Sequence, residues 1–170
     1  MMAAFGIILP IAFHTFGLGN KFLPMLLPIL LNGFLSRLSW AMATGALVPL
    51  ASGLLTGMPP FYPPIALVMS VEGSLMAGTA AFIYRLNKAR IWPALLTAIA
   101  VDRTVSLTLI WLLSGKFGLP AAFLSAGSFI HGLPGVALQL TVIPVVIRAL
   151  KMRNGILYKG NDEHTASILQ

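Results

Sequence analysis

Long apolar runs follow one another along most of the chain, separated by short segments that contain Gly, Pro or charged residues. These runs are longer than the roughly 10-residue alternating strands of an outer-membrane barrel, so the pattern predicts an all-α fold. Six helices are expected, over residues 2–18, 24–36, 40–56, 64–86, 91–114 and 121–150. The second helix is short, because about 20 residues are needed to cross ~30 Å of hydrocarbon.

The composition indicates that these helices lie in a membrane. Of the 170 residues, 58% are hydrophobic and 9% are charged, and the mean hydropathy is +0.91. So few charged side chains cannot cover a soluble domain, whereas lipid solvates an apolar exterior. We therefore predict one multi-pass domain of the cell inner (plasma) membrane over residues 1–151. The polar tail 152–170 is expected to lack regular structure. The N-terminal run lacks the basic region of a signal peptide and is interpreted as the first helix.

The basic residues predict the orientation of the domain. With six spans, both termini share one side with the connections between helices two and three and between helices four and five. That side carries Arg37, Arg85, Lys88, Arg90, Arg148, Lys151, Arg153 and Lys159. The other side carries only Lys21 and Lys116. Because cytoplasmic loops are enriched in Lys and Arg, both termini are predicted to be cytoplasmic. The net charge of +7 is thereby explained without a nucleic-acid partner.

Three ionisable residues interrupt the apolar runs and need a partner or a function, because charge is expensive in a bilayer. Glu72 and Arg103 each lie roughly 20 Å from the cytoplasmic ends of their helices, so we predict that they form an ion pair. Either a structural pair or a direct ligand contact fits these residue types. Asp102 points about 100° away from Arg103 around the helix. Asp102 is either a second partner for Arg103 or for a hydroxyl such as Thr97, Thr104 or Ser106, or it leaves a surplus negative charge for a cationic ligand group, a protonated histidine or water.

Further polar candidates lie in the last helix. His131 stands beside the helix-loosening Gly132 and Pro134, which favours a functional role, whereas His14 is interpreted as an interfacial residue. Gln139 can serve as interhelical hydrogen-bonding partner or as a ligand contact. The sequence has no cysteine, and its histidines and carboxylates lack metal-ligand spacing, so neither a metal nor another cofactor is predicted. No P-loop or nucleophile–base motif is present, so the chain itself is not predicted to be an enzyme.

The stretch TGMPPFYPP joins the third and fourth helices on the predicted external side. Proline fixes φ and extends the residue before it, so this loop loses little entropy when it orders. It is either a helix-ending turn with interfacial rings or a rigid cover that holds Phe61 and Tyr62 over a ligand. Small residues in the first helix, Ala3, Ala4 and Gly6, allow close approach of another helix, within the protein or from a partner.

Several strings carry a family resemblance: LPIAFHTFGLGNKFLPMLLPILLNGFL, LVPLASGLLTGMPPFYPP, the Glu72 segment, Asp102-Arg103 and GLPGVALQLTVIPVVIRAL. In order and spacing, over residues 3–151, they resemble the substrate-binding S components of energy-coupling factor (ECF) transporters. The resemblance implies a six-helix membrane protein that binds a vitamin or related nutrient near the external face. It also implies a coupling membrane subunit and two ATP-hydrolysing subunits as partners.

Carried onto this chain, the resemblance makes Glu72, Arg103 and His131 the polar part of a substrate site. The full set of candidate substrate-binding residues is Glu72, Arg103, His131, Tyr62, Phe61, Asp102 and Gln139. The candidate lid residues are Thr56, Gly57, Met58, Pro59 and Pro60. Ala3, Ala4 and Gly6 are the candidate docking residues for the coupling subunit.

The chain departs from the family pattern at the docking helix and at Asp102. Ile7 and Ile8 follow Ala3 and Ala4 four residues on, where relatives often carry an Ala-x-x-x-Ala pair. Relatives tend to have a small residue at the position of Asp102. The start MMAAF lacks the Met-His of the metal-ion branch, which argues against nickel or cobalt. The alternative function is a stand-alone secondary transporter or channel, with Glu72 and Asp102 on an ion path.

Overall fold

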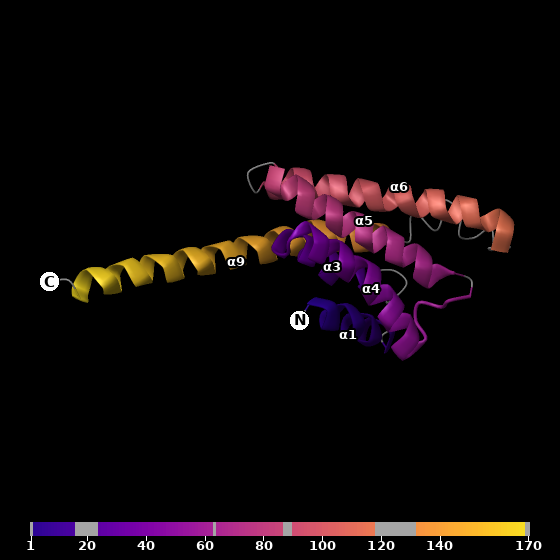
Figure 1. The fold of residues 1–170 in the computed structure, drawn as a ribbon, viewed down its shortest axis with the longest axis horizontal. Coiled ribbons are helices and arrows are strands. Elements are labelled where there is room, and N and C mark those ends of the chain that lie inside the picture. Colours follow the sequence, from indigo (N-terminus) through magenta and orange to yellow (C-terminus); the bar gives the residue numbers. More distant parts are fainter. Residues whose placement is uncertain (1, 16–23, 63, 87–89, 118–131, 169–170) are drawn as a thin grey trace.

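The computed structural model describes residues 2–15, 24–62, 64–86, 90–117 and 132–168, and only the backbone of 14–15, 115–117 and 153–168. All its regular structure there is helical, which confirms the predicted fold class (Figure 1). The helices are α1 (Met2–Thr15), α3 (Leu26–Leu35), α4 (Leu38–Thr56), α5 (Ile65–Leu86), α6 (Ile91–Phe117) and α9 (Leu133–Ile168).

Four of these helices are long and apolar enough to cross a membrane. The qualifying segments are Leu38–Thr56, Ile65–Leu86, Ile91–Ser114 and Leu133–Met152. The apolar parts of α1 and α3 are shorter, Met2–Phe13 and Leu26–Leu35. The shortness predicted for the second helix is confirmed, since α3 has 10 residues.

The last helix extends further than the sequence pattern predicts. The tail from residue 152 was expected to lack regular structure, but α9 continues to Ile168, so that expectation is wrong for the backbone of residues 152–168. This segment contains two glycines and no proline, and glycine costs a helix only about 1 kcal/mol relative to alanine. A continuous helix is therefore compatible with its residues.

Helix α5 is the centre of the bundle. It packs against α3, α4 and α6, while α1 contacts α3 and α4, and α9 contacts α3 and α6. In Figure 1, α6 runs along one side of α5, with α3 and α4 on the other side. The apolar core between these helices includes Leu30, Met76, Leu95 and Ile143, all with exposed fractions of 0%.

Glycines let α5 approach its neighbours backbone to backbone. A Cβ placed on Gly45 of α4 would lie 2.2 Å from the carbonyl oxygen of Gly73. A Cβ placed on Gly33 of α3 would lie 2.7 Å from the carbonyl oxygen of Ala77. Such contacts are the means by which helices associate tightly where apolar side chains gain little from leaving lipid.

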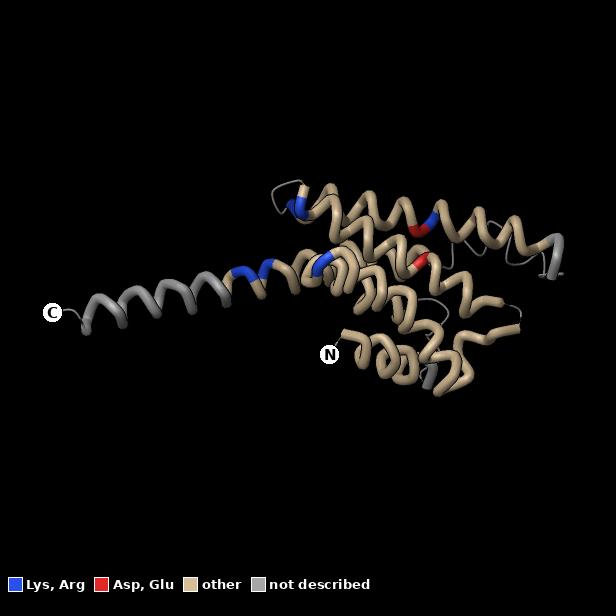
Figure 2. Tube along the Cα trace, viewed as in Figure 1, with Lys and Arg blue, Asp and Glu red and all other residues tan. Residues whose placement is uncertain are grey.

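The basic and acidic residues of the bundle lie mostly at different distances along its long axis (Figure 2). Apart from Arg103, the Lys and Arg whose side chains are described gather at the end of the bundle where α5 meets α6, opposite the α4–α5 loop; they are Arg37, Arg85, Arg90, Arg148 and Lys151. Arg85 donates a hydrogen bond to the carbonyl of Ser36, and the Lys151 ammonium lies 5.2 Å from the ring centroid of Tyr84.

The contact between Gly45 and Gly73 generates a stability prediction. Gly45→Ala places a methyl group against the α5 backbone, so the helices must separate, and we expect a loss of about 1–3 kcal/mol in unfolding free energy. Thermal unfolding of the purified protein in detergent measures it. Ala100→Val, at an exposed position of α6, is the control and should leave the midpoint almost unchanged. An unchanged midpoint for Gly45→Ala contradicts the backbone contact.

Candidate ligand-binding site

Four polar side chains from three helices lie inside this apolar bundle, and we call them the polar layer: Glu72 on α5, Asp102 and Arg103 on α6, and Gln139 on α9. Glu72 is 6% exposed, and Asp102 and Gln139 are each 1% exposed. The Arg103 side chain is 21% exposed. All four are candidates from the sequence. Their burial among apolar helices means that each polar group needs a partner there.

Gln139 on α9 and Glu72 on α5 lie at a similar level, because the Lys151 ammonium lies 5.2 Å from the Tyr84 ring centroid and each polar residue precedes its helix's member of that contact by 12 positions. The polar-layer residues on α5, α6 and α9 are each about one turn from a buried core residue, Met76, Ile99 and Ile143 respectively. The polar residue precedes the core residue in α5 and α9 and follows it in α6. Because α6 runs opposite to α5 and α9 (Figure 1), all three steps point toward the end that carries the α4–α5 loop. The polar layer thus lies on the loop side of Met76, Ile99 and Ile143.

The charge contact within this layer differs from the predicted one. Arg103 Nη2 lies 2.9 Å from Asp102 Oδ2, and this is the ion pair among the described residues, so the predicted Glu72–Arg103 pair is wrong. The two partners are sequence neighbours about 100° apart around α6. The distance between them is that of an ion pair, but neither carboxylate oxygen of Asp102 accepts a well-directed hydrogen bond.

Glu72 faces the same group of side chains from α5. Its carboxyl group interacts with the Ser106 hydroxyl and with the charges of Asp102 and Arg103. Asp102 and Ser106 are four residues apart and therefore lie on the same face of α6. Two carboxyl groups accordingly share the surroundings of one guanidinium group.

Five buried atoms of the polar layer have no hydrogen-bond partner within the described part of the chain. They are both carboxylate oxygens of Asp102, Nε of Arg103 and both amide atoms of Gln139. The buried serines differ, because Ser52 donates to the Met58 carbonyl at 2.7 Å and Ser70 to the Ala46 carbonyl at 2.6 Å. An unsatisfied buried polar group costs about 1–3 kcal/mol. Asp102 and Gln139 therefore present acceptors and donors that a polar ligand can satisfy.

The start of the α4–α5 loop is held by hydrogen bonds to α4. Gly57 adopts φ 72°, and its N–H donates to the Gly53 carbonyl at 3.0 Å, which ends the helix in a left-handed cap. The Thr56 hydroxyl accepts from the Met58 N–H at 3.3 Å, and Ser52 reaches the carbonyl of the same residue. Sequence reasoning missed Ser52, although its position one turn before Thr56 is a usable signal.

The two aromatic rings of this loop have different surroundings. Phe61 packs against α4, since a Cβ on Gly53 would lie 2.9 Å from its ring. Tyr62 is 79% exposed and therefore lies at the surface in this structure. Pro59 is buried, and the Pro60 carbonyl accepts a hydrogen bond from the Ala66 N–H at 3.0 Å. The loop is thus anchored through Phe61 and its prolines, while Tyr62 is available for contacts.

The candidate docking residues of α1 do not share one face. Gly6 is buried against α4, where an added Cβ would lie 2.6 Å from Val48 Cγ1. Ala3 and Ala4 are exposed. Gly6 accordingly serves internal packing, which is one of the two roles that small residues were expected to have.

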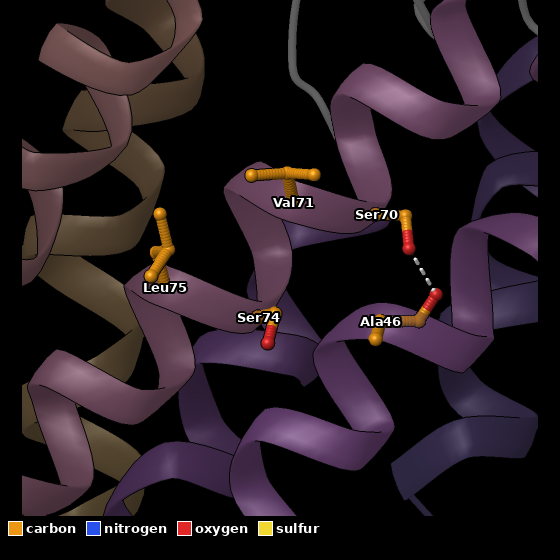
Figure 3. Close-up of a pocket in the computed structure, with 5 residues that line it drawn as sticks. All are labelled: Ala46, Ser70, Val71, Ser74 and Leu75. Carbon is orange, nitrogen blue, oxygen red and sulfur yellow. Dashed lines mark hydrogen bonds between the residues drawn. The ribbon is translucent and has the colours of Figure 1, made fainter.

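A shallow pocket of about 240 Å³ lies between α4 and α5, away from these candidates (Figure 3). It is lined by Ala46, Ser70, Val71, Ser74 and Leu75. In Figure 3, the Ser70 hydroxyl points to the Ala46 carbonyl across the groove. None of the residues predicted to bind substrate lines this pocket, so it is distinct from the polar layer.

Two histidine candidates are not placed. His131 and the side chain of His14 lie outside the described residues. Among the side chains that are described, no three His, Cys, Asp or Glu residues converge as a metal site.

These helices and their apolar exteriors are those of a multi-pass membrane protein. In the comparisons with known proteins, the chain matches no family model, no curated protein and no solved structure.

The Asp102–Arg103 contact can be tested by removing its cation. Arg103→Gln leaves the buried Asp102 carboxylate without its cation. Because Arg103 is partly exposed, we expect the unfolding free energy to fall by about 3 kcal/mol, near the lower end of the range for broken buried ion pairs. Denaturant unfolding in detergent measures it. Adding Asp102→Asn should restore most of the lost stability, and adding Glu72→Gln should restore less. A larger rescue by Glu72→Gln would identify Glu72 as the partner of Arg103.

Proposed function

We propose that this chain is the membrane-embedded substrate-binding subunit of an ECF-type importer. It captures a small water-soluble vitamin or precursor at the external face of the membrane. It delivers this compound inward together with a coupling membrane subunit and two ATPase subunits. The strings that resemble S components cover most of the chain, from residue 3 to residue 151.

The single observation that carries this proposal is the set of partnerless buried atoms in the polar layer. Small-molecule sites combine mostly apolar walls with a few convergent polar groups. Ionisable residues inside membrane helices are rare, because they are costly there, and they mark substrate and ion pathways. Glu72, Asp102 and Gln139 come from three helices at one level, which suits them to surround a compound of vitamin size.

The proposed topology has six spans with both termini in the cytoplasm. The gathering of Arg37, Arg85, Arg90, Arg148 and Lys151 at one end supports this orientation, because cytoplasmic ends are enriched in basic residues. In this topology, α1 and α3 supply the other two crossings. The α4–α5 loop is then external, and the polar layer lies on the loop side of Met76, Ile99 and Ile143.

Co-expression tests the proposal directly. The tagged chain is produced together with the ECF coupling subunit and ATPases from the same genome, purified in detergent and reconstituted in liposomes. We expect a stoichiometric complex, a small compound identifiable by mass spectrometry, and ATP-dependent uptake of that compound. Uptake driven by an ion gradient through the chain alone would instead support the stand-alone secondary transporter.

The loop rings supply a second test of this site. Tyr62→Ala should reduce the amount of co-purifying compound several-fold without changing the melting temperature, because Tyr62 is exposed. Phe61→Ala is the matched variant and should lower the melting temperature, because Phe61 packs against Gly53. Mass spectrometry and thermal unfolding measure the two effects. Unchanged retention of the compound by Tyr62→Ala removes Tyr62 from the site.

A further inference from the structure

The polar layer contains one more acidic group than basic group. Glu72 and Asp102 are its carboxyl groups, and Arg103 is its cation. The other Lys and Arg whose side chains are described lie at the far end of the bundle (Figure 2), and Arg85 is 13 residues from Glu72 along α5, or roughly 20 Å. Interactions between charges are stronger among buried groups than in water. The layer therefore carries an uncompensated negative charge when its groups are ionised.

The geometry of Asp102 leaves this charge accessible to hydrogen-bond donors. Arg103 approaches Asp102 Oδ2 at 2.9 Å, yet both Asp102 oxygens lack a directed hydrogen bond. Ionised carboxylates only accept hydrogen bonds. Glu72 faces the same two residues from the neighbouring helix. A cationic nitrogen that carries hydrogen would supply both the missing donors and the missing positive charge.

Gln139 is an independent indication that a ligand occupies this level. It is 1% exposed on α9, it lies in the same layer as the acids, and neither atom of its amide has a partner within the described chain. An amide offers one acceptor and two donors without charge. It matches a neutral polar group on the compound whose cationic group meets the acids.

We propose that the polar layer selects small organic cations, with Asp102 and Glu72 binding a protonated, hydrogen-bearing nitrogen and Gln139 binding a neutral polar group of the same molecule. This inference rests on the proposed binding function and names its substrate class.

The test uses the purified full chain in detergent and two series of matched compounds. Each series has an amine, a neutral alcohol and an acid on one ring: phenethylamine, 2-phenylethanol and phenylacetate, and tryptamine, tryptophol and indole-3-acetate. Thermal unfolding across a concentration series gives the apparent affinity of each compound. We expect the amine to bind more tightly than the alcohol in at least one series, and the acids to bind most weakly. The inference is contradicted if neither amine binds more tightly than its alcohol. It is also contradicted if NaCl at equal ionic strength shifts the melting temperature as much as the amine does.

Variants assign the preference to its residues. Asp102→Asn should lower the affinity for the amine by about tenfold to 100-fold while changing that for the alcohol little, because it removes a charged acceptor. Glu72→Gln is a second carboxylate variant, usable should Asp102→Asn not fold. Gln139→Leu is the matched uncharged variant and should weaken the amine and the alcohol alike. An amine preference unchanged in both carboxylate variants overturns the inference.

The outcome is separable from that of the proposed function. Assembly with the coupling and ATPase subunits is measured on the same preparations and does not depend on ligand charge. A complex that assembles and imports an anionic compound overturns the cation inference alone. An amine preference in a chain that binds no coupling subunit overturns the importer proposal and leaves the cation site in place.

Discussion

The backbone contact between α4 and α5 is the constraint on which the rest of the bundle depends. Only glycine at Gly45 and Gly73 permits it, because a Cβ at either position would meet the opposite carbonyl group. It holds α5 in the centre, where α3 and α6 also pack against it. Glu72 directly precedes Gly73, about 100° away around the helix, so the face that touches α4 also fixes how Glu72 is presented to α6.

This packing leads to an uneven distribution of polar groups in the bundle. Ser52 and Ser70 satisfy backbone carbonyls and stabilise the helices and the loop. Asp102 and Gln139 are buried as deeply, but their polar atoms have no such partners. A bundle that needed only stability would gain from apolar residues at these positions. The presence of such polar groups in the interior is the physical basis for proposing a substrate site there.

The sequence was informative about the helices and less so about their faces. The predicted segments 64–86, 40–56 and 24–36 lie within two residues of Ile65–Leu86, Leu38–Thr56 and Leu26–Leu35 at both ends. Helical rise placed Glu72 and Arg103 at similar levels, but level does not determine which side chains turn toward each other. Asp102, which the sequence offered only as a second partner of Arg103, is its ion-pair partner. A small residue fits either an inner or an outer face, and only packing placed Gly6 against α4. His131 lies outside the described residues, and its role stays a prediction.

In the proposed site, the polar-layer atoms that lack a directed hydrogen bond bind a small molecule. An experimental structure of the purified protein with its co-purifying compound tests this most directly. We expect ligand density between α5, α6 and α9, with polar ligand atoms within hydrogen-bond distance of Asp102 and Gln139. Ligand density in the groove between α4 and α5 that is lined by Ser70 and Ser74, with Asp102 and Gln139 hydrogen-bonded only to other protein groups, would contradict this site.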